Sequence, residues 1–274
     1  MRQRSLVRLV SVMAALAPAG LVAGVAANGS QASATAVSIL HPPAVASTPG
    51  IRHDNVEFLN WSGYAVSSAT EFTDAAGSWV EPTATCPSRS TTYGSFWVGI
   101  DGYSSGSVEQ LGTDSDCVRG TPSYYAWYEM YPANSVTLSS AAYPVKAGDT
   151  LTGGVARSGT SYTLSLTDTE NGLVRWTYST VQAASDANSS AEWVAEAPEL
   201  CSFVCRLASL TDFGTVTFSE AQAAAGGALA PISSFSASGG PHDMTMVTNT
   251  GTIKAQPSAL APGGEGFSDT WYHS

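Results

Sequence analysis

Residues 96–112 read FWVGIDGYSSGSVEQLG, and this stretch separates two fold classes. It contains Gly-x-Ser-x-Gly, the pattern that in serine hydrolases places a nucleophile, here Ser104, on a turn between a strand and a helix. Residues 96–101 alternate as a strand does, but residues 107–112 look like a second strand rather than a helix. We therefore expect a hairpin with Ser104 in its loop, not the nucleophile of an α/β hydrolase.

The rest of the chain repeats this pattern of short strands. It shows no helical period over three turns, except at residues 219–225, and neither βαβ alternation nor an internal repeat. Many short strands at spacings of ~8–12 residues favour an all-β sandwich or barrel. We expect loops at residues 225–241 and 256–267. Further strand-like segments are residues 124–131, 150–155, 162–167, 173–180, 191–196 and 215–219.

The first 34 residues have the features of a secretory signal peptide. Three Arg residues precede the apolar run 9–27, and an A-x-A cleavage sequence follows at residues 32–34. A membrane anchor is the alternative, but the run is short, rich in Ala and Gly and interrupted by Pro18. We therefore expect a secreted, extracellular protein that has no membrane contact once the signal peptide (residues 1–34) is cleaved.

The segment that follows the signal peptide, residues 35–56, contains several Pro residues and little periodicity. This composition predicts a short pro-segment or linker. We expect residues 57–274 to form a single β-sandwich domain, and the protein to be a monomer.

The charge balance excludes one class of partner. Cleavage after Ala34 removes three of the 11 basic residues and none of the 22 acidic ones, which leaves a net charge of −14. Binding to phosphates requires the opposite sign, so we expect no nucleic-acid partner. Charged residues make up only 12% of the chain. A protein that works in acid has reason to carry few basic groups, because these stay charged when the carboxylates are neutralised. Neutral secreted β-proteins share this composition.

The chain has four cysteines, an even number that predicts two disulfides in a secreted protein. We expect the pairs Cys86–Cys117 and Cys201–Cys205, with the other two connectivities left open. A zinc site is disfavoured because Cys201 and Cys205 have no His nearby, and the four His residues stand singly without metal-ligand spacing. We expect no metal and no cofactor.

Strand alternation places carboxylates beside aromatic side chains. Trp97 shares a strand face with Asp101, and Trp127 shares one with Glu129. A third strand ends in Glu196, whose neighbours are apolar; a partly desolvated carboxyl has a raised pKa and can act as an acid or a base. Such a face suits a groove for an extended polymer. The residue types alone do not choose between a peptide and a glycan.

Other peptidase nucleophiles have little support in the sequence. Neither Asp-Thr-Gly nor Asp-Ser-Gly occurs, so the turns of an aspartic peptidase are absent. Lysine is confined to Lys146 and Lys254, and the cysteines are expected to be oxidised.

Several blocks of sequence, in the same order, resemble the eqolisins, the glutamic peptidases. Each block alone is modest, but together they are specific, and they span about residues 58–220. The blocks are NWSG (60–63), WVGIDG (97–102), EQLG (109–112), YAWYEMYP (125–132), GD (148–149), AEWVAE (191–196) and residues 207–219.

The resemblance implies a secreted acid endopeptidase that pepstatin does not inhibit and that cleaves protein or peptide substrates. It implies a sandwich of two antiparallel, bent sheets, of the concanavalin A-like lectin/glucanase type. By the resemblance, Glu196 is the general base and acid, and Gln110 positions the attacking water and stabilises the oxyanion. It further implies that five residues line or support the cleft: Trp61, Trp97, Asp101, Trp127 and Glu129.

The sequence departs from the family in two respects. Family members carry a Cys just after the WVGIDG block, and it is paired with a Cys just before the strand of the catalytic glutamate. In this chain the corresponding residues, 104–105 and 188–190, contain no Cys. The pro-segment is also short, which argues against inhibition by a long basic propeptide.

The alternative function is a carbohydrate-binding or glycoside-hydrolysing β-sandwich. A glycosidase would need a second carboxylate within ~5–10 Å of the first, and it would have no use for Gln110.

Overall fold

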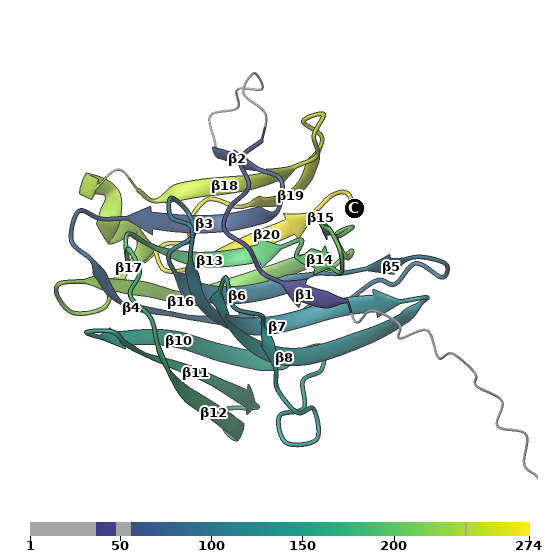
Figure 1. Cartoon of the computed structure of the whole chain (residues 1–274), viewed down its shortest axis with the longest axis horizontal. Helices are drawn as coiled ribbons and strands as arrows, with labels where there is room; N and C mark the ends of the chain where they lie inside the picture. The colour runs from purple at the N-terminus through teal and green to yellow at the C-terminus, as the bar shows by residue number, and fades with distance from the viewer. Residues whose placement is uncertain (1–36, 48–55, 239) are drawn as a thin grey trace, which may run out of the picture. The chain divides into compact units, whose positions relative to one another are not determined.

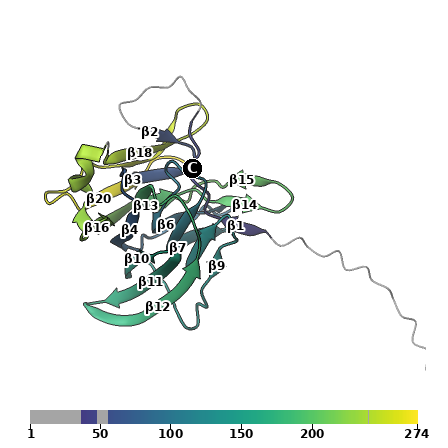
Figure 2. The ribbon, with the colours of Figure 1, turned by 60° about the vertical axis from the view of Figure 1, so that its left-hand side comes forward.

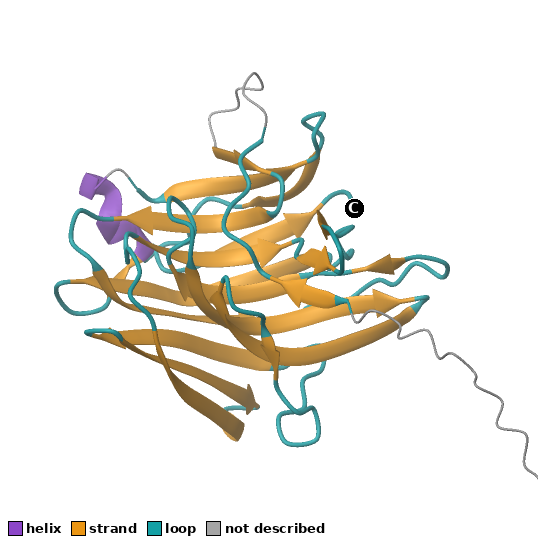
Figure 3. Cartoon of the chain, viewed as in Figure 1, coloured by secondary structure: helices purple, strands orange, loops and turns teal. Residues whose placement is uncertain are grey.

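The computed structural model describes residues 37–47, 56–238 and 240–274 and is built almost entirely of strands (Figures 1 and 3). The predicted signal peptide, residues 1–34, and much of the predicted pro-segment lie outside the described residues. In the described part of the chain, no helix has the length and hydropathy of a membrane span.

The first sheet carries most of the residues that the sequence marks for function. Its strands pair in the order β9–β8–β7–β6–β13–β3–β18, all antiparallel, while β2 (Val56–Phe58) runs parallel to β18 and β5 (Thr91–Thr92) pairs with β7. The bounds are β9 (Val136–Thr137), β8 (Thr121–Tyr131), β7 (Val108–Val118), β6 (Ser95–Ile100), β13 (Ser190–Glu196), β3 (Trp61–Ser67) and β18 (His242–Val247).

The second sheet packs behind the first and is joined to it along one edge. Its order is β12–β11–β10–β4–β16–β20, again antiparallel, and β19 (Ile253–Pro257) pairs with both β20 and β18, which makes the two sheets continuous. The bounds are β12 (Leu173–Ala183), β11 (Ser161–Glu170), β10 (Thr150–Ser158), β4 (Phe72–Val80), β16 (Thr215–Ala225) and β20 (Phe267–Trp271).

A small third sheet stands apart from these two. It consists of β1 (Ser38–Leu40), β14 (Glu199–Cys201) and β15 (Cys205–Leu207), paired antiparallel in that order (Figure 2). Its first strand comes from the segment predicted to be a pro-segment or linker.

The core lies between the two large sheets, and alternation along each strand determines which side chains enter it. On β13, Trp193 faces this core while Val194 belongs to a separate apolar cluster on the opposite face. Burying a large apolar side chain completely contributes roughly 1.5–3 kcal/mol. Among the largest buried side chains of the core are Trp79, Trp193, Tyr162, Phe72, Phe96, Phe213 and Phe218.

Several sequence predictions can be compared with this fold. The all-β sandwich of antiparallel sheets is confirmed, and so are the hairpin of β6 and β7 and the disulfides Cys86–Cys117 and Cys201–Cys205. The expected helix at residues 219–225 is wrong. These residues belong to β16, whose register shifts between Ser219 and Gln222; the alternation disturbed by this bulge explains why the segment lacks a clear strand period.

The expected loop at 225–241 is only partly correct. It contains β17 (Ala230–Pro231), which pairs with β16, and a 3₁₀ helix, η1 (Ile232–Ser238). Glycine, alanine and serine make up most of this stretch, so neither period is visible in the sequence.

Candidate active site

Pairing of neighbouring strands places the predicted site residues on the outer face of the first sheet. Gln110 on β7 pairs in register with Glu129 on β8, and two residues further along, Gly112 on β7 pairs with both Trp97 and Trp127. Glu196 ends β13, opposite Trp61 on β3. Period-2 alternation along each strand points these side chains away from the core.

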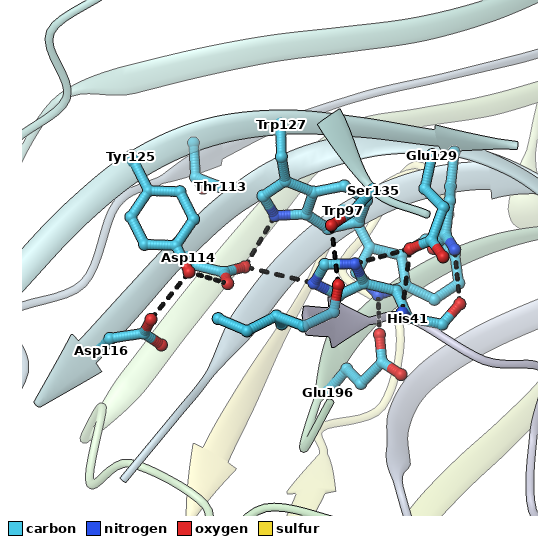
Figure 4. Close-up of polar contacts among 12 residues, drawn as sticks. His41, Trp97, Thr113, Asp114, Asp116, Tyr125, Trp127, Glu129, Ser135 and Glu196 are labelled. Atoms are coloured by element: carbon cyan, nitrogen blue, oxygen red, sulfur yellow. Dashed lines mark hydrogen bonds and ion pairs between the residues drawn. The ribbon is translucent and has the colours of Figure 1, made fainter. Parts of the chain in front are cut away.

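Glu196 is completely buried, more so than the partly desolvated carboxyl that the sequence suggests. Its Oε2 accepts a hydrogen bond of 2.8 Å from the indole Nε1 of Trp97 (Figure 4). Burial raises the pKa of Glu196 to about 8, although the charge of His41 and the Trp97 donor act in the opposite direction. This is the environment of a carboxyl that can exchange a proton with a reacting group.

Two glycines make room for the Trp97 ring beside Gln110. A Cβ on Gly99 would lie 3.1 Å from both the Gln110 Cβ and the Trp97 ring, and one on Gly112 would lie 2.6 Å from the Trp97 Cβ. The ring also packs edge-on against Trp61, with centroids 4.8 Å apart. Trp61 therefore supports the position of Trp97.

Gln110 is fully buried, and its amide binds a peptide carbonyl. Its Nε2 donates a hydrogen bond of 2.6 Å to the backbone oxygen of His41. Within the described residues, Gln110 Oε1 and Glu196 Oε1 are buried without a hydrogen-bond partner. Buried polar atoms normally have partners, so each of these oxygens is available to accept a hydrogen bond from a further polar group.

His41 is one of the residues at this site that sequence reasoning missed. Its backbone N–H and its ring Nδ1 contact the same atom, Glu129 Oε2, at 2.9 and 2.8 Å, and its ring lies flat on Trp127 with centroids 3.5 Å apart. The ring Nε2 lies 3.5 Å from Asp114 Oδ1, an ion-pair distance. Figure 4 shows His41 between the labelled side chains of Glu129 and Glu196.

The environment of His41 favours the imidazolium form. Burial by itself would lower the pKa of His41, but its contacts with Asp114 and Glu129 and the nearby charge of Glu196 raise it to about 10. A buried cation is tolerated when carboxylates surround it in this way.

A second group of polar residues that the sequence analysis missed holds Trp127 and Asp114 in place. Asp114 accepts hydrogen bonds from Trp127 Nε1 at 2.6 Å and from the Tyr125 hydroxyl at 2.8 Å, and the same hydroxyl contacts Asp116 at 2.8 Å. Burial and the charge of Asp114 raise the pKa of Asp116 to about 8. Alternation from Gln110 along β7 could have identified Asp114 and Asp116, since both lie on the same face.

Asp101 is also predicted for the site, but it acts from a different place. It follows β6 with a φ of +71°, and its carboxylate accepts hydrogen bonds from the backbone N–H groups of Asn188 (2.5 Å) and Ser189 (2.8 Å). It therefore holds the turn that leads into β13. Ser104 is exposed and contacts Ser189 Oγ at 3.4 Å.

Among the described residues, one group has the residue types that bind metals, but its chemistry does not suit a metal site. It consists of Glu199, Cys201 and Cys205, whose two sulfurs are joined in a disulfide. Disulfide sulfurs are not the thiolate ligands that metals prefer.

Comparisons with known proteins identify the family of the chain and agree with its fold. The model of the Peptidase A4 family matches residues 59–259. Aspergillopepsin-2 of Aspergillus niger is 29% identical over 211 residues, which cover 69% of each chain. A crystal structure of Scytalido-glutamic peptidase with a peptide-based transition-state analogue superposes with a TM-score of 0.63 at 22% identity, covering 78% of this chain and 98% of the other.

A third relative is SCP-B, described as a member of the Eqolisin family in a complex with the tripeptide Ala-Ile-His. It superposes with a TM-score of 0.61 at 22% identity, over 78% of this chain and 98% of the other.

Proposed function

The chain belongs to the Peptidase A4 family, and from that premise we propose that it is a secreted glutamic endopeptidase in which Glu196 and Gln110 activate the water that cleaves a peptide bond. The observation that carries this proposal is the hydrogen bond of 2.6 Å from Gln110 Nε2 to a peptide carbonyl, beside the buried carboxyl of Glu196.

The chemistry follows from the two side chains. Glu196, as a carboxylate, takes a proton from water, whose oxygen attacks the carbonyl carbon of the substrate; Glu196 then passes that proton to the leaving nitrogen. The Gln110 NH₂ group donates to the oxygen that becomes the oxyanion. The buried oxygens Glu196 Oε1 and Gln110 Oε1 are suited to hold the water.

A glutamine is suited to acid conditions in this role. Its amide does not titrate, so it remains a donor and an acceptor at a pH where a second carboxylate would be protonated. Trp97 complements it, because its indole N–H favours the ionised form of Glu196.

The carbohydrate alternative fits these contacts less well. Glycoside hydrolysis uses two carboxyl groups on either side of the bond that breaks. In such a mechanism the amide of Gln110, which is buried and bound to a peptide carbonyl, has no part.

The cellular setting belongs to the same proposal. Residues 1–34 would direct secretion and be removed, and the enzyme would act as an extracellular monomer on proteins or peptides. Residues 37–47 are held against the sheet domain and not separated from it as a linker would be.

A panel of substrates tests this function. The secreted chain, incubated in acid, is offered a denatured protein and several polysaccharides from about pH 2 to pH 8, with pepstatin present. We expect pepstatin-resistant peptide cleavage at acid pH and no release of sugars. Release of sugars without peptide cleavage would contradict the proposal and favour the carbohydrate alternative.

A further inference from the structure

Lys254 is a buried lysine whose ammonium pairs with no side chain in the part of the chain that the structure describes. Only 7% of its surface is exposed. Burial alone lowers the pKa of Lys254 to about 8, and no charge of a neighbouring residue contributes to this shift. Lysine is almost never fully buried in folded proteins unless it is paired. This side chain is therefore a candidate to bind a ligand.

The backbone around Lys254 is fixed on both sides. β19, which carries this residue, pairs with β18 and with β20. Met246 pairs with Ala255 and Val247 with Ile253, so Lys254 is an extra residue with no partner on β18. A bulge of this kind re-aims a side chain. Ala255 belongs to the core between the sheets, whereas Lys254 lines a pocket at the surface.

The pocket has a volume of about 230 Å³ and is formed by segments that are far apart in the sequence. Leu59 precedes β3, residues 207–209 include the end of β15, and residues 247–249 include the end of β18. Ser274 completes it, and Figure 1 shows the end of the chain beside β15. One water molecule takes up about 30 Å³ in the liquid, so the pocket has room for a small organic ion.

The lining of the pocket has an apolar part and a polar part. The Thr248 hydroxyl is used within its own turn, where it accepts from the Thr252 N–H at 3.0 Å. Ser209 and Asn249 are exposed, and their hydroxyl and amide groups can donate hydrogen bonds to a ligand at the rim. The apolar lining residues are Leu59, Leu207, Ala208 and Val247.

We infer that this pocket binds a monocarboxylate with a short aliphatic part, whose carboxylate pairs with the Lys254 ammonium while its carbons contact the apolar residues. Two sources share this chemistry: a small organic acid and the C-terminus of a peptide. None of the residues that line the pocket belongs to the site of Glu196 and Gln110, so the pocket is independent of the peptidase function.

The charges favour a monocarboxylate over a phosphate. The pocket offers one ammonium group, which a single negative charge balances, and a second buried charge without a partner would be costly. The whole chain has a formal net charge of −11, which repels a doubly charged anion more strongly than a singly charged one. The apolar residues favour contact with aliphatic carbons over contact with phosphate oxygens.

The ionisable groups around Lys254 leave its ammonium to the ligand. The terminal carboxylate of Ser274 is the one other ionisable group that the lining residues carry, and it does not act on the pKa of Lys254. The neighbouring elements β2, β15, β18 and β20 and the end of the chain carry further groups that neither line the pocket nor shift this pKa. These are Glu57, Arg206, His242, Asp243, Asp269 and His273.

Binding should be confined to a range of pH. The ligand must be ionised, which requires a pH above about 5, and Lys254 must be protonated, which requires a pH below about 8. Because the ligand binds only the ammonium form, binding raises the pKa of Lys254. At a ligand concentration of ten times the Kd, this rise is about one unit.

The small number of lysines gives a direct test. Lys146 and Lys254 are the only two, so the full chain labelled with ¹³C at the lysine ε-carbon gives two NMR signals. Lys146 is the internal control, because it is exposed and pairs with Glu170 at 2.6 Å. Without ligand, the Lys254 signal should titrate well below the Lys146 signal. Titration as high as that of Lys146 would show that an anion of the chain itself, such as the Ser274 carboxylate, already fills the pocket, and would overturn the inference.

Isobutyrate is the first probe, at about pH 6.5 in a buffer without carboxylate or phosphate. We expect a saturable shift of the Lys254 signal and no shift of the Lys146 signal. Isobutyramide, which has the same shape without the charge, and inorganic phosphate should give no shift at the same concentration. The inference would be overturned by the absence of a response to isobutyrate, by parallel shifts of both lysines, or by an equal response to isobutyramide or phosphate.

A matched pair of variants tests the role of the ammonium itself. Saturation transfer from the protein to the isobutyrate methyl groups should be seen with the wild type and with Lys146→Met, and should be lost with Lys254→Met. Transfer that persists in a folded Lys254→Met chain would refute the ion pair.

N-acetylalanine distinguishes the two sources, because it carries the carboxylate and the preceding amide of a peptide C-terminus. A Kd at least about tenfold below that of isobutyrate would identify a peptide C-terminus, and an equal or higher Kd would identify a small organic acid. These measurements need no cleavage of a substrate, so their failure would leave the proposed function untouched.

Discussion

Trp97→Phe should move the acid limb of the activity profile to higher pH. The Trp97 indole N–H donates to Glu196 Oε2 at 2.8 Å, inside a site where the carboxyl is completely buried. This donor stabilises the ionised form of Glu196 and so lowers its pKa against the effect of burial. Phenylalanine keeps an aromatic ring beside Trp61 but has no donor.

The size of the effect follows from the strength of that hydrogen bond. A hydrogen bond to a charged group contributes about 1.5–3 kcal/mol, and a change of one unit in a pKa corresponds to about 1.4 kcal/mol. Loss of the donor should therefore raise the acid limb by about one to two pH units. The direction is upward because Glu196 must be ionised to accept a proton from water.

The assay is the pH dependence of kcat/KM on a small peptide, which reports the pKa of the free enzyme. Trp176→Phe is the matched control, because the Trp176 indole donates to the Pro144 carbonyl and not to a site residue. An acid limb that stays in place in a folded Trp97→Phe enzyme would refute the role of Glu196 as the base. A limb that moves equally in Trp176→Phe would attribute the shift to general loosening of the fold.

Other consequences concern the second catalytic residue, a disulfide and stability. Gln110→Ala should lower kcat by about 10²–10³-fold on a peptide substrate, because it removes an oxyanion donor; a change confined to KM would contradict that role. Cys86→Ser/Cys117→Ser should lower the free energy of unfolding in urea by about 3–4 kcal/mol, since the bridge spans a sequence separation of 31 residues; an unchanged midpoint would count against this. Burial raises the pKa of Glu109 to about 9 and that of Asp269 to about 8. At a pH between the ordinary pKa of each carboxyl and its raised pKa, the group is protonated in the folded chain and ionised in the unfolded chain. A rise in pH through this range therefore favours the unfolded chain, and the melting temperature should fall as the pH rises from about 5 to 8; a rise in the melting temperature would refute this account.

Because side chains alternate along a strand, much of the site could be predicted from the sequence. Trp127 and Glu129 lie on one face of a single strand, and Gln110 precedes Asp114 on one face of another, so each pair could be placed without knowledge of the fold. The pairing of Gln110 with Glu129 depends on strand register, which only the packed sheet establishes.

His41 could not be predicted in the same way. It is a single histidine in a Pro-containing stretch, with no strand period around it, and its partner Glu129 is 88 residues away. The contact arises because β1 adds to β14 and carries His41 over the sheet. Composition can predict a pro-segment or linker, but it does not predict which part of the folded domain that segment contacts.

The prediction of a helix at residues 219–225 is wrong for a local reason. Its Ala and Gln residues favour a helix, but this part of β16 pairs with β4 and, at Gln222 and Ala223, also with β17, and tertiary pairing prevails over weak propensity. The bulge within it interrupts the alternation that would have indicated a strand.

The most direct test of the account is the rate of Glu196→Gln on a peptide substrate in acid, with pepstatin present. Glu71→Gln is the matched control, because Glu71 is exposed and contacts Arg157 at the surface. All chains are first processed by tagged wild-type enzyme, which is then removed, so that each is assayed without the predicted pro-segment. We predict that Glu196→Gln loses activity by about 10³-fold or more while its fold is unchanged, and that Glu71→Gln matches the wild type. A processed Glu196→Gln chain that cleaves the peptide at nearly the wild-type rate would contradict the assignment of Glu196 as the catalytic base.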